Sequence, residues 1–303
     1  MRVMASPKAP SSAHPFPIVD AHHHFWDPRR NYHPWLCDDP PIAFRYGDYS
    51  AIRRPYLSEH YLADAKDYEL RGSVYVETEW DPAHPVDEMR YVRELRAACG
   101  LPSVAVAAAW LHESRTASLL ESYLEFDFVR GVRHKPPPGA MTSSEWRRGF
   151  AELVRRGLRY DLQAPWAQLS DAISLARDFD EARIIINHAG LPADRSQAAL
   201  SAWAKVMREL SRCPNIAIKI SGIGQQGKAW TAQANREIVL TLIECFGVER
   251  CMFASNFPVD SLCASFSQIF GGFREIVADF TDLERRALFG GNALRLYDIA
   301  VGI

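Results

Sequence analysis

Eight short, β-rich apolar runs recur along this chain, and they constrain its fold more than any other feature. The runs are Ile18–Ala21, Gly72–Thr78, Val104–Trp110, Val129–Arg133, Arg159–Gln163, Arg183–Asn187, Ile216–Ile220 and Cys251–Ala254. From the second run onward their spacing is roughly 25–35 residues, the size of a strand–helix–strand unit. This rhythm predicts a parallel α/β architecture.

The segments between the runs support the same interpretation. Apolar residues recur at helical spacing in Val86–Cys99, Ser196–Ser211, Thr231–Phe246 and Ser265–Val277. Runs such as RIIIN and VAVAAAW are almost continuously apolar, as expected for parallel strands that are buried on both faces. About eight such units predict a single-domain (β/α)8 TIM barrel. The alternative, an open doubly wound sheet, normally carries a glycine-rich nucleotide loop after its first strand, and none follows the first run here.

The first interval is longer than the others, with roughly fifty residues between the first and second runs. Most of them lie between Phe25 and Ser58, a stretch rich in aromatic residues, prolines and arginines that includes Arg45, Arg53 and Arg54. A loop that follows a barrel strand lies on the catalytic face. We therefore interpret it as a lid over the barrel mouth, and the alternative is a wrap along the side of the barrel.

Composition and the chain ends limit the classes of partner. Residues 1–15 are rich in Pro, Ser and Ala without the apolar stretch of a secretory signal, so we expect a flexible lead-in there and one barrel over residues 16–303. The longest apolar run, Val104–Leu111, is too short to span a membrane. A net charge of −2 gives no electrostatic reason to expect nucleic acid or an anionic membrane as a partner. Six scattered cysteines without a CxxC pair fit reduced thiols in a cytoplasm.

The strongest local motif closes the first run, where Asp20-Ala21 is followed by His22-His23-His24. Side chains alternate along a strand, so His22 and His24 point to one side and His23 to the other. Two imidazoles directed into a barrel mouth form half of a binding site for a divalent cation such as Zn²⁺. The alternative is a pair of packed or hydrogen-bonded histidines.

Polar residues also occur at or near the ends of most of the other runs. They are Glu77 and Glu79 at the end of the second, Arg133 and His134 at the fourth, Gln163 at the fifth, His188 after the sixth, Lys219 in the seventh, and Ser255, Asn256 and Asp260 after the last. Such a ring of polar residues is typical of a barrel active site. Proximity to water explains one or two of them well, but it explains the whole set poorly.

Several of these motifs together resemble a known family. VDAHHHFWD, GVRHKP, YDLQ, INHAGLP, IKISG and CMFASNFPVD occur in this order. The chain resembles the amidohydrolase-related superfamily from about Ile18 to Tyr297, and within it the lactonases similar to fuconolactonase, rhamnonolactonase and 2-pyrone-4,6-dicarboxylate lactonase. The resemblance implies a (β/α)8 barrel that hydrolyses a small cyclic ester, with or without one divalent metal. It assigns the metal-site positions to His22, His24 and His188.

One departure from the family pattern concerns the last strand. The family has Ser-Asp-Trp-Pro, with the Asp as general base, whereas this chain has Ser255-Asn256-Phe257-Pro258. An amide can orient a water molecule or act as a weak metal ligand through its oxygen, but it cannot take a proton. The candidates for the base are then Asp260, Glu77 and His188.

The sequence is compatible with a metal-dependent and with a metal-free mechanism. In a metal-dependent mechanism, three neutral imidazoles bind Zn²⁺ and lower the pKa of its bound water towards about 7. In a metal-free mechanism, the histidines and Lys219 bond the substrate carbonyl, and a carboxylate activates water.

Residues for substrate recognition are predicted from chemistry alone. Arg133 and the arginines of the loop can hold a carboxylate in bidentate fashion, while ion pairing at the surface is the alternative. His134 and Gln163 lie at the ends of the fourth and fifth runs, and Lys219 lies within the seventh. Tyr32, Trp35 and Trp166 can form an aromatic or sugar-binding wall, and packing in the core is their alternative role.

These observations predict a cytoplasmic hydrolase that opens a small lactone, either acidic or derived from a sugar. The alternatives are a metal-dependent, non-oxidative decarboxylase of a small aromatic or enoic acid, and a catalytically silent barrel that binds a sugar acid or a protein partner. All three share one fold, which by itself does not decide the function. The expected partner is a small molecule, with no nucleic acid and no membrane, and a homodimer is left open.

Overall fold

The eight predicted runs form eight parallel strands of one sheet, in sequence order. The computed structural model describes residues 16–300, so the predicted lead-in at residues 1–15 lies outside the described part. The strands are β1 (Ile18–His23), β2 (Leu70–Val76), β3 (Val104–Ala108), β4 (Val129–His134), β5 (Arg159–Leu162), β6 (Ile184–Ile186), β7 (Ile216–Ile220) and β8 (Cys251–Phe253). The prediction of a single TIM barrel is confirmed.

The barrel is closed between its first strand and the residues that follow its last. His23 forms a parallel bridge with Phe257, and the amide of His24 donates to the Phe257 carbonyl at 2.8 Å. The amide of Asn256 donates to the carbonyl of His22 at 2.8 Å. These bonds fix the two ends of the sheet in register, so the histidine motif of β1 lies beside the motif that follows β8.

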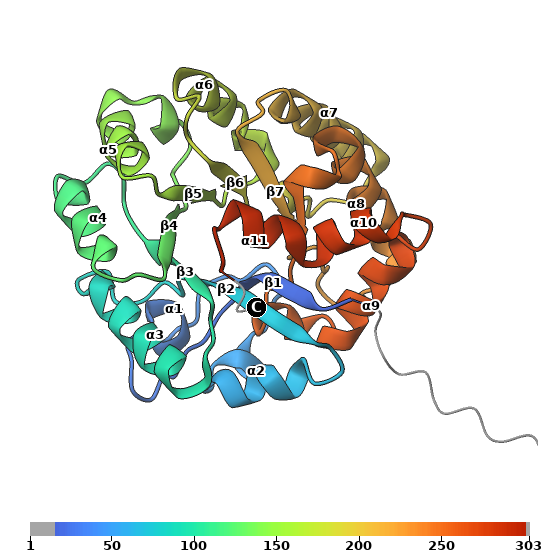
Figure 1. Cartoon of the computed structure of the whole chain (residues 1–303), viewed down its shortest axis with the longest axis horizontal. Coiled ribbons are helices and arrows are strands. Elements are labelled where there is room, and N and C mark those ends of the chain that lie inside the picture. Colours follow the sequence, from blue (N-terminus) through green and yellow to red (C-terminus); the bar gives the residue numbers. More distant parts are fainter. Residues whose placement is uncertain (1–15, 301–303) are drawn as a thin grey trace, which may run out of the picture.

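Helices surround the strands, as Figure 1 shows. They are α2 (Ser58–Asp64), α3 (Pro85–Cys99), α4 (Thr116–Leu124), α5 (Ser144–Arg155), α6 (Ser170–Asp178), α7 (Gln197–Ser211), α8 (Ala232–Phe246) and α9 (Phe266–Ile276). The four predicted helical segments correspond to α3, α7, α8 and α9. Within residues 16–300, no helix combines the length and the apolar character that a membrane crossing requires.

Local signals set the helix ends. Pro85 occupies the first turn of α3, where its missing N–H costs nothing, and Gly100 ends the helix in the left-handed region at φ 77°. The hydroxyl of Ser265 caps α9, and Gln268 bonds back to the Ser265 amide, which completes a capping box. The six cysteines are all free thiols.

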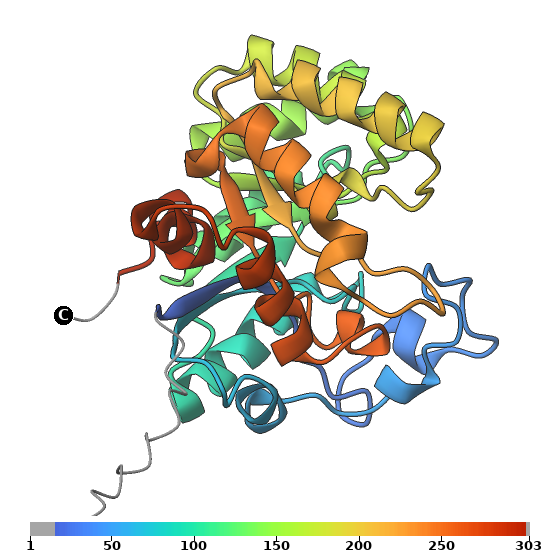
Figure 2. The same ribbon diagram turned by 90° about the vertical axis from the view of Figure 1, so that its right-hand side faces the viewer.

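The barrel interior has its own small apolar cluster. Its members come from strands on several sides of the barrel, so they can meet only inside it; they include Val19, Val74, Val106, Ile185, Ala217 and Met252. Tyr297, which follows α11 (Asn292–Leu296), belongs to the same cluster. In Figure 1 the segment made of α10 (Asp282–Arg286), η7 (Ala287–Gly291) and α11 lies in front of the strands, inside the ring of helices. Figure 2 shows this segment on the opposite side of the barrel from the loop that follows β1.

Candidate active site

A cavity of about 220 Å³ opens at the C-terminal ends of the strands. Strand ends and the turns after them supply His24, Thr78, Glu79, Arg133, Lys135, Gln163, His188, Asn256 and Val259. The long loop after β1 supplies Trp26, Trp35, Ile42, Phe44 and Arg45. The loop, which contains α1 (Pro34–Cys37) and η1 (Ser50–Ile52), therefore contributes directly to the barrel mouth, as a lid would.

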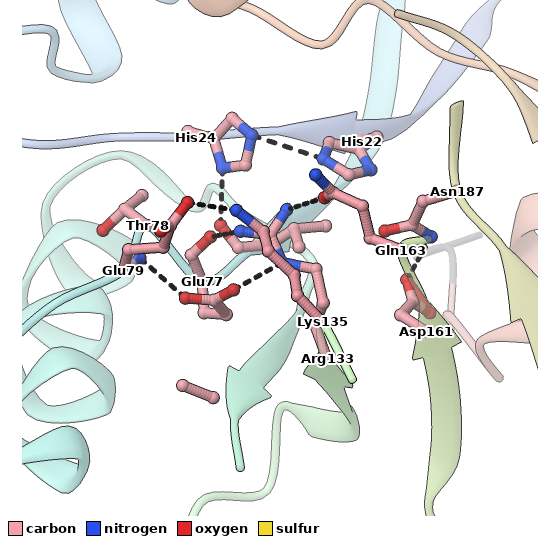
Figure 3. A network of polar contacts seen from close by, with 12 residues as sticks. His22, His24, Glu77, Thr78, Glu79, Arg133, Lys135, Asp161, Gln163 and Asn187 are labelled. Carbon is pink, nitrogen blue, oxygen red and sulfur yellow. Dashed lines mark hydrogen bonds and ion pairs between the residues drawn. The ribbon is translucent and has the colours of Figure 1, made fainter. Parts of the chain in front are cut away.

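The two predicted histidines of β1 face each other. Nε2 of His22 lies 3.3 Å from Nε2 of His24, while His23 points away and bonds the Ser73 hydroxyl at 2.9 Å (Figure 3 shows the first contact). Nδ1 of His24 lies 2.7 Å from the carbonyl of Val76. Because a carbonyl only accepts, Nδ1 of His24 carries the hydrogen and its Nε2 has a lone pair. In the neutral pair, Nε2 of His22 must then be the donor.

The third predicted histidine joins this pair. The ring centroids of His22 and His188 are 4.5 Å apart, and Nδ1 of His188 lies 3.0 Å from the Ser221 hydroxyl. Burial lowers the pKa values of His22, His24 and His188 well below the ordinary value, and the nearby cationic groups lower them further. The site thus contains a cluster of neutral imidazoles. A side chain at Gly222 would collide with the His188 ring, which explains the glycine in the IKISG motif.

The histidine cluster falls short of a complete metal site. Among the described residues, no group of three or more His, Cys, Asp or Glu side chains is arranged to hold a metal ion. The predicted site of His22, His24 and His188 is therefore not formed in this structure, although Nδ1 of His22 is buried without a partner among the described residues. A catalytic zinc needs three protein ligands around one point, and in this structure the three neighbouring imidazoles of His22, His24 and His188 are not arranged in that way.

Asn256, at the position where the family has its base, is held by Asp260. Its backbone is in the left-handed region at φ 56°, and its Nδ2 donates to Oδ1 of Asp260 at 2.6 Å. The same oxygen accepts from the Tyr46 hydroxyl at 3.0 Å and from Arg45 at 3.4 Å. Asp260 is 1% exposed and lies outside the cavity lining, and burial raises its pKa. Its contacts with the cavity lining therefore run through Asn256 and Arg45.

Glu77 and Arg133 form a buried pair. Arg133 donates to the Glu77 carboxylate, to the Glu77 carbonyl at 2.6 Å and to Oε1 of Gln163 at 3.0 Å (Figure 3). Burial raises the pKa of Glu77, but the charges of Arg133 and Lys135 outweigh it, and the net shift is downward. Glu77 and Arg133, both predicted from strand ends, thus neutralise each other's charge. Glu79 and Lys135 form a second, more exposed ion pair beside them.

Lys219 belongs to a different network in the barrel interior. Its ammonium lies 2.7 Å from Oδ2 of Asp161, which also accepts from Asn187 at 3.2 Å and from the Tyr297 hydroxyl at 2.9 Å. Lys219 and Asp161 are both fully buried. Sequence reasoning did not assign a role to Asp161 or Tyr297, although alternation along β5 indicates that Asp161 points inward.

Of the remaining predicted residues, Trp35 and His134 line a cavity, whereas Tyr32 and Trp166 do not. Trp35 lines the cavity above the histidines and a neighbouring cavity, and His134 lines the neighbouring one. Tyr32 is 46% exposed and shares its hydroxyl hydrogen with the Asp38 carboxylate. Trp166, in η3 (Trp166–Gln168), lies outside the linings of both cavities. Sequence reasoning also did not single out Tyr46, whose contact with Asp260 ties the long loop to the end of β8.

Comparison with known proteins agrees with this architecture. A model of the amidohydrolase family matches residues 19–299. The uncharacterized protein y4mH of Sinorhizobium fredii is 39% identical over 295 residues, which cover 93% of this chain and 98% of that protein. The L-fucono-1,5-lactonase of Burkholderia multivorans is 29% identical over 299 residues, covering 92% of this chain and 95% of that protein.

A solved structure confirms the fold. An amidohydrolase from Burkholderia multivorans with bound zinc matches with a TM-score of 0.80 at 24% sequence identity. The match covers 94% of this chain and 100% of that chain.

Proposed function

This chain belongs to the amidohydrolase family, and on that premise we propose that it is a hydrolase that opens a small, neutral lactone. The observation that carries the proposal is the meeting of His22, His24, His188 and the Asn256 amide at the end of the barrel. The kinship with an L-fucono-1,5-lactonase supports the reaction class.

We assign the activation of water to His188. It lines the cavity, whereas Asp260 lies outside that lining and Glu77 is paired with Arg133. In the tautomer in which Nδ1 of His188 donates to the Ser221 hydroxyl, the lone pair of Nε2 is available to a water molecule. Because Nδ2 of Asn256 is bound to Asp260, its carbonyl oxygen is the end left to orient that water.

The reaction then follows from these positions. His188 takes a proton from the water, and the hydroxide attacks the carbonyl carbon of the ring. The ring C–O bond breaks, and His188 returns the proton to the departing oxygen. Oε1 of Gln163 accepts from Arg133, so the amide hydrogens of Gln163 can stabilise the negative charge that develops on the carbonyl oxygen of the lactone. Figure 3 shows the amide nitrogen of Gln163 directed towards the histidines.

The charges around the cavity favour an uncharged substrate. Each of its three basic residues has a carboxylate partner: Arg133 pairs with Glu77, Lys135 with Glu79 and Arg45 with Asp260. An anion bound there would compete with these carboxylates for the basic groups, and the carboxylates would repel it. Of the two predicted substrate types, we therefore prefer the sugar-derived lactone to the acidic one.

A pH-indicator assay on the purified protein tests the proposal. The panel contains neutral aldonolactones with five- and six-membered rings, the anionic 2-pyrone-4,6-dicarboxylate, and a carboxylated phenol assayed for carbon dioxide release. We expect acid release from a neutral lactone. Turnover of the dicarboxylate alone would contradict the charge argument, carbon dioxide release would favour the decarboxylase, and silence throughout would favour the binding barrel.

Variants test the assignment of the base. His188→Asn should lower kcat by about a hundredfold or more, the range for loss of a general base. His84→Asn is the matched control, because His84 is exposed and pairs with Asp81 away from the cavity. Equal turnover in the two variants would remove His188 from the mechanism.

A further inference from the structure

A second cavity, of about 510 Å³, lies beside the one above the histidines. The two share Trp35, Ile42, Glu79, Arg133 and Lys135 in their linings, so they are neighbours across a common wall. The second cavity is the larger one, and no step of the proposed reaction uses it. To reach from the histidines into the second cavity, a ligand must pass this shared wall, on which the Glu79–Lys135 ion pair is partly exposed.

The walls of the second cavity are largely apolar and aromatic. They include Trp35, Trp80, Trp110, Pro34, Pro40 and Pro82. Flat indole faces and proline rings suit a planar apolar group, which gains free energy both from burial and from ring contacts. The charged residues of the lining are Asp38, Glu77, Glu79, Arg133 and Lys135, and the last three also line the first cavity.

The three tryptophans are held in place by their own contacts. Nε1 of Trp35 donates to the Thr78 carbonyl at 2.8 Å, and Trp80 packs edge-on against the His33 ring with centroids 5.1 Å apart. The guanidinium of Arg115 lies 5.6 Å from the Trp110 ring. Walls that are fixed before a ligand arrives lower the entropic cost of binding.

One polar group on the wall has a defined role. Nε1 of Trp146 donates to Nδ1 of His134 at 3.1 Å. An indole N–H only donates, so Nδ1 of His134 holds a lone pair, and in the neutral ring Nε2 carries the hydrogen. His134 can therefore donate one hydrogen bond to an oxygen on a ligand in this cavity.

We propose that the second cavity binds an aryl substituent of the substrate, so that the protein acts on a neutral lactone whose ring carries an aromatic group. This inference rests on the proposed function, because it places the lactone ring at the histidines. Trp35, Trp80 and Trp110 hold the aromatic group, and His134 donates to an oxygen substituent on it.

Binding of lactams tests the proposal without turnover, because an amide ring resists the hydrolysis of an ester. Isothermal titration calorimetry compares δ-valerolactam with 6-phenyl-δ-valerolactam on the full chain. We expect the phenyl compound to bind about tenfold tighter or more. Trp110→Ala should remove most of that difference and leave the affinity for the unsubstituted lactam unchanged.

Two further variants serve as controls. Trp110→Phe keeps an aromatic wall and should retain the preference, and Trp166→Ala removes a half-buried tryptophan outside both cavities and should also retain it. Equal affinity for the two lactams, absence of binding by the phenyl compound, or a preference unchanged in Trp110→Ala would each overturn the subsite. Hydrolysis of unsubstituted lactones by the wild-type protein reports on the proposed function separately.

Discussion

The side-chain amide of Asn256 donates to the carboxylate of Asp260 across 2.6 Å, and this contact settles which end of the amide faces the cavity. A carboxylate only accepts, so the nitrogen must be the atom next to Asp260. Asp260 and the backbone of Asn256 thus hold a carbonyl oxygen where relatives of the resembled branch carry a carboxylate. Tyr46 and Arg45 bond the same carboxylate, which links the long loop to this orientation.

Replacement of Asp260 separates positioning from proton transfer. Asp260→Asn should keep most of kcat, because its carbonyl oxygen can accept the same hydrogen bond. Asp260→Ala should lower kcat by about tenfold or more with little change in KM, a loss of about 1.4 kcal/mol in transition-state stabilisation. Steady-state kinetics on both variants checks this, and abolished turnover in Asp260→Asn would identify Asp260 as the base after all.

Asn256→Asp should increase the metal content of the purified protein. The new carboxylate would stand beside the His22–His24 pair and supply the third ligand that the described residues lack. Elemental analysis of the wild-type protein and the variant measures the content, and Gln163→Glu, which adds the same charge elsewhere in the cavity, is the control. Equal metal content in the wild-type protein and in Asn256→Asp would show that residue 256 is not a metal ligand.

The two ion pairs at the mouth should differ strongly in their effect on stability. Arg133 and Glu77 have side chains only 4% and 6% exposed, so Glu77→Gln leaves a buried charge unpaired and should cost about 3–5 kcal/mol. Glu79→Gln breaks the exposed pair with Lys135 and should cost about 0–1 kcal/mol. Urea unfolding of both variants tests the contrast, and similar losses would show that the Glu77 pair is effectively solvated.

Glu88 should make the protein less stable as the pH rises. Its Oε1 accepts from the Tyr75 hydroxyl and from the backbone and side chain of Thr78, and burial raises its pKa to about 8. Between the unfolded value near 4.5 and about 8, the folded state holds a proton that the unfolded state has released. The contribution of Glu88 to the free energy of unfolding therefore falls across this window, by at most about 1.4 kcal/mol per pH unit.

Glu88→Gln tests this dependence, because glutamine does not titrate. Urea unfolding at several pH values between 5 and 8 should show that the stability of the variant falls less, or rises more, with pH than that of the wild type. The same slope in both proteins would show that Glu88 is not the group responsible.

Part of the candidate site follows from local rules. Alternation along β1 correctly predicts that His22 and His24 face one side and His23 the other, and the eight apolar runs predict the strands that carry the polar ends. The roles of the polar residues at those strand ends do not follow from local rules. Arg133 looks like a substrate ligand in the sequence, yet in the structure it is neutralised by Glu77, which is 56 residues away in the chain.

The sequence by itself determined the barrel, because strand burial and the strand–helix rhythm depend on residues that are near one another in the chain. Only the tertiary structure decided which charges are paired and which end of the Asn256 amide faces the cavity. It also showed that Asp260 lies outside the cavity lining and bonds two residues of that lining, Asn256 and Arg45. The reason is physical: a hydrogen bond forms or fails within a few tenths of an ångström, and contacts such as Tyr46 with Asp260 join segments more than 200 residues apart.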